Sequence, residues 1–146
     1  MIRAYNDSDK AELLEIFRLN TPKNFGPEEI KDFEKYIQLQ SDNYSTIEYK
    51  GKIVGGVGYE VKSSDASGRI TWIFFHPKYT GYGLGKKAVE HCIAILKQKP
   101  EVKKLVVSTS QMAFKFFEKL QYKLVRVEKD YWAKGIDLYS MERQLD

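Results

Sequence analysis

Cysteine and proline are scarce in this sequence, and long apolar runs are missing. Of the 146 residues, one is cysteine (Cys92) and four are proline. A single cysteine excludes an intrachain disulfide framework and a metal cage built from several cysteines. No apolar run is long enough to cross a bilayer, and the first residues, "MIRAYNDSDK", lack the apolar core of a signal peptide. We therefore expect a cytoplasmic protein with no bound metal and no membrane partner.

Charge of one sign is not concentrated in any segment. The 24 lysines and arginines and the 20 aspartates and glutamates leave a net charge of +4, and both signs are mixed along the chain. Proteins that bind nucleic acids more often carry a basic stripe. Nucleic-acid binding is therefore a hypothesis that rests on the positive balance alone, and we expect no nucleic-acid partner.

The rest of the sequence is typical of a folded α/β domain. Hydrophobic residues make up 42% of the chain and charged residues 30%, and the length fits a single domain over residues 1–146. Apolar spacing predicts the order β-α-α-β-β-β-α-β-α-β-β, a mixed α/β domain. Single strands are expected over residues 2–5, 69–77 and 103–109, and hairpins of two strands over 44–62 and 122–145. The first helix is expected to begin near residue 7 or 8, and three further helices are expected over 25–40, 84–97 and 110–121.

The stretch "TGYGLGKK", residues 80–87, indicates a site for an anion. It follows a strand that ends at Pro77 and comes directly before the helix expected from Leu84. Backbone N–H groups at the start of a helix point outward, and the helix dipole adds partial positive charge there. Glycine has no Cβ and lets oxygen atoms approach the main chain. A turn that only reverses the chain is the alternative interpretation.

Two familiar nucleotide loops do not fit this spacing. A Walker A loop needs a glycine five residues before the Gly-Lys pair, where this chain has Thr80, and a Ser or Thr where it has Lys87. A dinucleotide fingerprint needs a glycine three residues after Gly83, where this chain has Lys86. Neither motif is therefore present.

The loop resembles that of the GNAT superfamily of N-acetyltransferases, which reads Gln/Arg-x-x-Gly-x-Gly/Ala after a hydrophobic-x-Pro step. Phe75 and Pro77 match the step, Gly83 and Gly85 match the small positions, and Thr80 stands at the Gln/Arg position. The resemblance implies a sheet splayed by a bulge in its central strand, and it implies acetyl-CoA as co-substrate, with its pyrophosphate on this loop. The implied coenzyme-A-binding residues are Phe74, Phe75, His76, Thr80, Gly81, Tyr82, Gly83, Leu84, Gly85, Lys86, Ser110 and Phe117.

A second stretch, "SQMAFKFFEKLQY", resembles the family's Asn-x-x-Ala-x-x-Phe-Tyr-x-Lys-x-Gly-Phe motif. Ser110 stands at the Asn, and we also expect it to cap the helix that begins there. Phe117 stands at the Tyr that serves as general acid in the family, and Phe cannot donate a proton. Water, Ser110 or Tyr122 could replace that hydroxyl, or catalysis is weak. The resemblance makes Phe75, Ser110 and Tyr122 the expected catalytic residues, Phe75 through a main-chain N–H that polarises the acetyl carbonyl.

The resemblance also implies an amine as acceptor, bound near the first two helices and the last hairpin. The expected acceptor-binding residues are Glu28, Asp130, Tyr131 and Trp132. No carboxylate lies in "ITWIFFHP", so Glu60, His76 and Asp130 are the candidate general bases, with surface charge as the alternative for each.

The function expected from this resemblance is acetyl-CoA-dependent N-acetylation. The acetyl group goes to a primary amine of a small molecule or protein by direct attack in a ternary complex. A module that binds acyl-CoA without catalysis is the alternative. Relatives commonly form dimers, so a homodimer is one expectation for the assembly.

Overall fold

The structure, a computed structural model, describes residues 1–145. In that range seven strands form one mixed sheet, hydrogen-bonded in the order β1-β2-β3-β4-β5-β7-β6. The strands are β1 (Ile2–Ala4), β2 (Tyr44–Tyr49), β3 (Lys52–Lys62), β4 (Ser67–Phe75), β5 (Lys104–Thr109), β6 (Lys123–Ala133) and β7 (Ile136–Gln144). The α-helices are α1 (Lys10–Leu19), α2 (Glu29–Leu39), α3 (Leu84–Lys97) and α4 (Phe114–Lys119). Strands β4 and β5 are parallel, and β1–β2, β2–β3, β5–β7 and β6–β7 are antiparallel. The predicted α/β class and order of elements are confirmed.

Contacts divide the chain into two units. The first contains residues 1–58 and 72–89, and the second contains residues 59–71 and those from Glu90 onward. Strands β3 and β4 and helix α3 each continue from one unit into the other. No helix among residues 1–145 has both the length and the apolarity that a membrane span needs.

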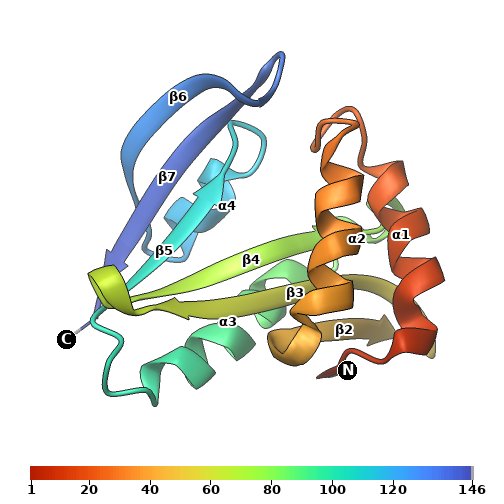
Figure 1. Cartoon of the computed structure of the whole chain (residues 1–146), viewed down its shortest axis with the longest axis horizontal. Helices are drawn as coiled ribbons and strands as arrows, with labels where there is room; N and C mark the ends of the chain where they lie inside the picture. The colour runs from red at the N-terminus through yellow and green to blue at the C-terminus, as the bar shows by residue number, and fades with distance from the viewer. Residues whose placement is uncertain (146) are drawn as a thin grey trace. The chain divides into compact units, whose positions relative to one another are not determined.

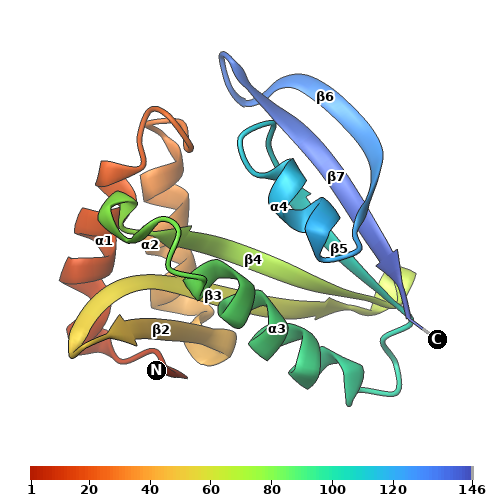
Figure 2. The same cartoon turned by 180° about the vertical axis from the view of Figure 1, so that it is seen from behind.

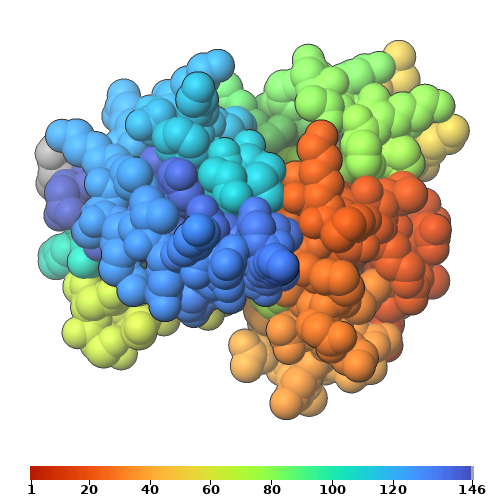
Figure 3. Space-filling view, turned by 90° about the horizontal axis from the view of Figure 1, so that it is seen from above, coloured from red at the N-terminus to blue at the C-terminus, as the bar shows by residue number. Residues whose placement is uncertain are grey.

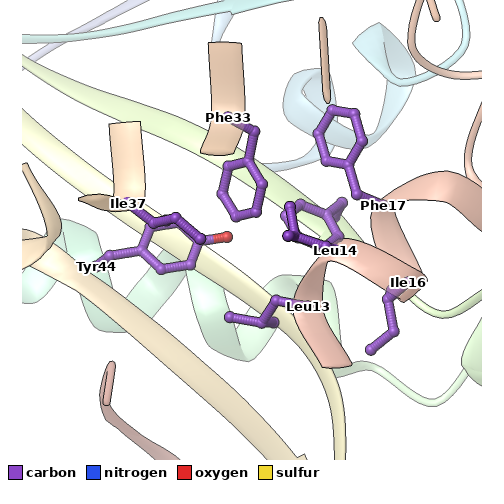
Figure 4. Packing of buried hydrophobic residues seen from close by; sticks show 8 residues of the cluster. Leu13, Leu14, Ile16, Phe17, Phe33, Ile37 and Tyr44 are labelled. Atoms are coloured by element: carbon purple, nitrogen blue, oxygen red, sulfur yellow. The ribbon is translucent and has the colours of Figure 1, made fainter. Parts of the chain in front are cut away.

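In the first unit, two helices and the strands enclose an aromatic core. Helices α1 and α2 lie side by side on one face of the strands of this unit (Figure 1), and the start of α3 lies on the opposite face (Figure 2). The ring of Phe33 stacks on Phe17 with centroids 5.3 Å apart, and it meets Phe74 edge-on at 5.1 Å. Figure 4 shows this packing around Leu13, Leu14, Ile16, Phe17, Phe33, Ile37 and Tyr44. Burial of each of these large side chains contributes about 1.5–3 kcal/mol.

Two glycines on β3 allow close packing beside this core. A Cβ at Gly55 would collide with the carbonyl oxygen of Phe74, and a Cβ at Gly56 would collide with the Tyr44 ring. Strand β4 and the Tyr44 side chain therefore approach the β3 backbone more closely than any residue with a side chain would permit.

The second unit is organised around β5. Its residues Leu105, Val106 and Val107 are buried, and β5 pairs with β4 through Ser67–Ile70 and with β7 along its whole length. A Cβ at Gly68 of β4 would lie 2.9 Å from a methyl group of Leu96, so glycine lets the end of α3 pack on this strand. The hairpin of β6 and β7 forms the blue surface in Figure 3.

A charged network joins β1, the start of α1 and β2 in the first unit. The two terminal nitrogens of Arg3 donate to Asp9 at 2.8 and 2.9 Å, and one of them also donates to Glu48 at 3.0 Å. Asp9 accepts two further hydrogen bonds, from the Thr46 hydroxyl and the Asn6 N–H, both at 2.9 Å. Hydrogen bonding to Arg3 is the main cause that lowers the pKa of the buried Asp9 carboxyl below its ordinary value.

We predict that Asp9→Asn lowers the free energy of unfolding by about 2 kcal/mol at neutral pH, because a charged acceptor of four hydrogen bonds is lost. A carboxyl whose pKa is lower in the folded state contributes stability above its unfolded-state pKa of about 3.9, and loses that contribution as pH falls through the folded-state value. Urea unfolding should therefore show the difference between wild type and variant shrinking below about pH 4.

Asp7→Asn is the control, since Asp7 is exposed and carries the same charge change. It should alter stability by only a few tenths of a kcal/mol. An equal loss for both variants, or a difference that does not change with pH, would contradict the role of the Asp9 network.

Candidate active site

The glycine loop connects β4 to α3 in the first unit. After β4 the chain forms a short 3₁₀ turn, η4 (Pro77–Tyr79), and α3 begins at Leu84. Gly81 has φ of +89° and Gly83 has φ of +75°, values that side chains other than glycine rarely adopt. A Cβ at either glycine would meet no atom within 4 Å. Backbone conformation therefore calls for glycine here, and the space above both residues is open.

The backbone N–H groups of the loop after Thr80 and of the first residues of α3 are not used by the described chain itself. The Thr80 N–H donates to the Pro77 carbonyl at 3.4 Å, and the Lys87 N–H donates to the Gly83 carbonyl at 3.3 Å. Between them, the N–H groups of residues 81–86 have no acceptor anywhere in the described chain. The predicted row of donors thus starts at Gly81 rather than at Thr80. A row of unpaired N–H groups at the start of a long helix is the arrangement that binds phosphate oxygens.

The end of β4 is irregular. Trp72 has φ of +46°, which is outside the extended region and rare for so large a side chain. The hydroxyl of Tyr44 on β2 donates to the Trp72 carbonyl at 2.8 Å, and this bond holds the distorted residue in place. The irregularity lies in the strand for which the resemblance implies a bulge.

A second side chain holds the last residue of β4. Asn20, at the end of α1, is buried, and its amide nitrogen donates to the Phe75 carbonyl and to the Ile16 carbonyl, both at 3.0 Å. Its side-chain oxygen accepts from Asn24 at 2.9 Å. Asn20 therefore fixes the main chain at Phe75, where a catalytic N–H is predicted. Sequence reasoning missed it, because no local pattern marks an asparagine that bonds a strand 55 residues away.

His76 makes two hydrogen bonds, one through its backbone N–H and one through its ring Nδ1. The His76 N–H donates to the Val54 carbonyl at 2.8 Å, and the ring Nδ1 accepts from the Lys78 N–H at 3.0 Å. An Nδ1 that accepts a hydrogen bond is unprotonated, so a neutral ring carries its proton on Nε2. To serve as a general base, His76 would have to give up the hydrogen bond from Lys78.

In the second unit, Ser110 closes a turn rather than capping a helix. Its hydroxyl oxygen accepts from the Met112 N–H at 3.3 Å. Helix α4 begins only at Phe114, its cap residue is Ala113, and no side chain caps it. The prediction that Ser110 caps a helix beginning at residue 110 is therefore wrong. Serine often bonds a backbone N–H two residues on, and this bond favours a turn over a helix.

The rings of Phe117 and Tyr122 pack edge-to-face with centroids 5.4 Å apart, and both are buried. The Tyr122 hydroxyl has no hydrogen-bond partner among the described residues. Burial raises the pKa of Tyr122 well above its ordinary value. This hydroxyl holds its proton firmly at neutral pH and is a weak acid.

The candidate residues of the β6–β7 hairpin are largely engaged within the hairpin and its surroundings. The Asp130 carboxylate accepts from the Gly135 N–H at 2.7 Å, and the Trp132 indole N–H donates to the Thr109 carbonyl at 3.1 Å. Tyr131 is exposed, and its ring packs edge-on against Trp132 at 4.9 Å.

Gln111 clamps the tip of this hairpin, a role that the sequence did not reveal. Its amide nitrogen donates to the Gly135 carbonyl at 2.7 Å, and its oxygen accepts from the Asp137 N–H at 2.9 Å. The turn around residues 110–113 and the hairpin tip are thus held to each other within the second unit.

The remaining acidic candidates differ in burial. Glu28 is exposed and faces Lys31 at 3.6 Å, and Glu60 is exposed on β3. Glu29, the neighbour of Glu28, is buried, and its carboxylate accepts from the Gly26 N–H at 2.7 Å. Desolvation raises the pKa of Glu29.

Cys92 is buried, and burial raises its thiol pKa to about 12, which makes it a poor nucleophile. Among the described residues, no group of three or more His, Cys, Asp or Glu side chains is placed to hold a metal ion. An open cavity of about 780 Å³ in the second unit is lined by residues that include Lys97, Lys123 and Arg143, and by none of the predicted site residues.

The structure therefore divides the predicted residues between the two units. Glu28, the end of β4 and the whole glycine loop belong to the first unit. Glu60, Ser110, Phe117, Tyr122 and residues 130–132 belong to the second.

Comparison with known proteins shows the family of this chain. A sequence model of the acetyltransferase (GNAT) family matches residues 10–122, which is most of the chain and includes the loop, the end of β4 and α4. The chain belongs to the GNAT acetyltransferase family. The predicted family is thus confirmed, although Thr80 and Phe117 depart from its usual residues. Sequence comparison with curated proteins finds no match.

Solved GNAT structures share the fold at low sequence identity. Ard1 from Thermoplasma volcanium superposes with a TM-score of 0.82 at 13% identity, covering 100% of this chain and 97% of the other. The ribosomal-protein-S18-alanine N-acetyltransferase from Escherichia coli has a TM-score of 0.79 at 19% identity, with 100% and 94% covered. A Salmonella typhimurium acetyltransferase with its cofactor acetyl-CoA has a TM-score of 0.74 at 17% identity, with 100% and 94% covered.

The hydrogen bond that holds the irregular end of β4 can be tested by a hydroxyl deletion. Tyr44→Phe should lower the free energy of unfolding by about 1 kcal/mol, because the Trp72 carbonyl loses its donor while the ring remains. The matched control is Tyr5→Phe. The Tyr5 ring packs against Tyr44 at 6.3 Å, but its hydroxyl has no partner among the described residues. Urea unfolding should show little change for the control, and equal changes in the two variants would contradict the assignment.

Proposed function

We propose that this GNAT protein is an acetyl-CoA-dependent N-acetyltransferase that acetylates a primary amine of a small molecule or protein by direct attack in a ternary complex. The observation that supports the proposal most strongly is the row of unpaired N–H groups over residues 81–86. The open space at Gly81 and Gly83 gives a diphosphate access to these donors. Lys86 and Lys87 are exposed and add positive charge beside the row.

The chain's own residues have separable roles in this reaction. The thioester of acetyl-CoA supplies the activated acetyl group. The loop binds the diphosphate and thereby orients the donor, and Phe74, Phe75 and His76 are the residues proposed beside the pantetheine arm. The Phe75 N–H is proposed to polarise the acetyl carbonyl, while Asn20 fixes the carbonyl of the same residue. The His76 N–H already donates to Val54, so His76 would contribute through its side chain or carbonyl.

For protonation of the leaving thiolate, Ser110 is our first choice. Among the described residues, the Ser110 hydroxyl oxygen accepts a hydrogen bond from the Met112 N–H. The hydroxyl proton is not used in this bond and is available for transfer. Tyr122 is the second choice, since its raised pKa makes it the weaker acid and its hydroxyl is buried. Water is the third.

For deprotonation of the amine, Glu60 is the candidate whose carboxylate makes no hydrogen bond in the described chain. The Asp130 carboxylate is engaged by the Gly135 N–H, and the Nδ1 of His76 by the Lys78 N–H. We therefore propose Glu60, acting through water, ahead of Asp130 and His76.

The acceptor class rests on Glu28, Asp130, Tyr131 and Trp132. The exposed Tyr131 ring is available for a cation–π contact with an ammonium group, and the Glu28 carboxylate is exposed beside Lys31. Solved structures with this fold include a ribosomal-protein-S18-alanine N-acetyltransferase and an aminoglycoside 6'-N-acetyltransferase, so the fold does not select among amines. A homodimer stays a prediction.

One observation favours a second function, acyl-CoA binding without transfer. Phe117 cannot donate a proton, and it is buried against Tyr122. An assay with acetyl-CoA and a panel of polyamines, amino acids and peptide N-termini separates the two functions. Turnover with any amine supports the transferase, and binding of acetyl-CoA without turnover supports the module.

We predict that Gly83→Glu abolishes binding of acetyl-CoA in calorimetry, because the new side chain places bulk and negative charge above the unpaired N–H groups. Gly51→Glu in the β2–β3 turn is a matched control. Gly51 has φ of +81° and Gly83 +75°, and a Cβ at either would meet no atom within 4 Å. Both variants should therefore lose similar stability, about 1 kcal/mol, from backbone strain. Unchanged affinity in Gly83→Glu, or equal loss in both, would refute the loop as the pyrophosphate site.

We also predict that Ser110→Ala lowers kcat by about a hundredfold, the lower end of the range for general acid catalysis, because the hydroxyl proton is lost. Ser110→Thr keeps a hydroxyl and should retain most of the activity. Steady-state rates across pH should be measured beside urea unfolding of each variant. A fall in stability with an unchanged rate in Ser110→Ala would leave Ser110 only its role in the turn.

A further inference from the structure

Three tyrosines from separate segments of the first unit contact one another at the glycine loop. We call Tyr49, Tyr79 and Tyr82 the tyrosine triad; Tyr49 ends β2, Tyr79 ends η4, and Tyr82 lies between the two loop glycines. Their ring centroids are 5.8 Å apart for 49–79, 5.3 Å for 49–82 and 5.5 Å for 79–82. All three pairs are edge-to-face, with planes at 66°, 80° and 62°, the geometry that aromatic quadrupoles favour.

Among the described residues, the N–H groups of the loop form no hydrogen bond that could hold it to the rest of the unit, although the Gly83 carbonyl accepts from the Lys87 N–H of α3. The N–H groups of residues 81–86 are unpaired in the described chain, and Thr80 bonds only the adjacent η4 turn, through its N–H and its hydroxyl. Gly81 and Gly83 flank Tyr82, and glycine gives the backbone more freedom than any other residue. Without other contacts, such a loop would sample many conformations in the free protein. Ordering the loop when the ligand binds would then lower the affinity.

The two partners of Tyr82 are themselves fixed. Tyr49 pairs with Lys52 in the β2–β3 ladder, and the Lys50 ammonium lies 5.4 Å from the centre of the Tyr49 ring. The Tyr79 N–H donates to the His76 carbonyl at 2.9 Å, and the Tyr79 ring meets the His76 ring edge-on at 5.8 Å. Figure 3 shows the green surface of the segment after β4 beside the gold atoms of the β2–β3 turn.

We infer that Tyr49 and Tyr79 are positioning residues that grip Tyr82 and so hold the unpaired N–H groups of the loop ready for the diphosphate. This inference rests on the proposed function, because it assigns the triad a role in binding acetyl-CoA. Tyr82 is 52% exposed although two rings pack against it, which fits a side chain that anchors a surface loop rather than one that fills the core. The triad supplies preorganisation that neither the glycines nor the hydrogen bonds of the loop provide.

The test compares Tyr49→Leu with Tyr49→Phe in the full chain. Tyr49→Leu should weaken acetyl-CoA binding about tenfold in calorimetry, since each edge-to-face pair has an energy that corresponds to about two- to tenfold in affinity. KM for acetyl-CoA should rise by the same factor, while kcat at saturation stays unchanged. Tyr49→Phe keeps the ring and should bind within about twofold of wild type, because the contacts use rings and not hydroxyls.

Two further measurements separate this inference from the proposed function. Tyr5→Leu removes another half-buried ring of the same unit, and it should change stability but not affinity. NMR order parameters of the Gly81 and Gly83 N–H groups, measured without ligand, should fall in Tyr49→Leu from about 0.85 toward 0.6. Wild type that fails to bind acetyl-CoA would overturn the proposed function, whereas unchanged order parameters and unchanged affinity in Tyr49→Leu would overturn the triad's role.

Discussion

The structure of the site depends on one constraint: a helix of 14 residues begins with donors that its own chain does not satisfy. Every helix leaves its first N–H groups unpaired, and a side-chain cap usually accepts one of them. Here the residues before α3 are two glycines at positive φ and a tyrosine, and no oxygen among the described residues serves the row over residues 81–86. The row can persist because residues 81–83 and Lys86 are exposed, so water can satisfy donors there until an anion replaces it.

The same side chains that build the core of the first unit also shape the end of β4. Tyr44 is buried among the aromatic rings, and its hydroxyl bonds the carbonyl of Trp72 at the distorted position. Gly56 leaves room for the Tyr44 ring, and Asn20 extends from α1 to the carbonyl of Phe75. A strained strand end persists only where the surroundings determine its conformation by several contacts. In this protein those contacts come from α1, β2 and β3, so a change in the core would alter the main chain proposed to act in catalysis.

The sequence predicted what local patterns determine. Helix α3 has the predicted bounds, the two predicted hairpins are present as β2–β3 and β6–β7, and the loop motif indicated the family correctly. The acetyl-CoA prediction agrees with solved relatives that hold acetyl-CoA or coenzyme A.

What the sequence did not predict are contacts between segments, and bonds in which a side chain competes for a local backbone group. Asn20, Gln111 and the tyrosine triad act across segments, and no periodicity marks such contacts. The start of α4 was placed too early, because Ser110 bonds a local N–H in a turn instead of capping a helix. The buried Glu29 carboxylate likewise bonds a local backbone group, the Gly26 N–H.

The packing around Phe117 bears on why a phenylalanine can stand at the tyrosine position of the motif that this segment resembles. Its ring is buried edge-on against Tyr122, whose hydroxyl is itself enclosed and unpartnered. A second hydroxyl at position 117 would need either solvent or an acceptor, because an unsatisfied buried hydroxyl costs about 1–3 kcal/mol. Phenylalanine has no hydroxyl and avoids that cost, so another group has to donate the proton. Ser110 has a hydroxyl proton that no described residue accepts, and for that reason protonation of the thiolate in this chain is proposed to depend on the turn before α4 rather than on the helix itself.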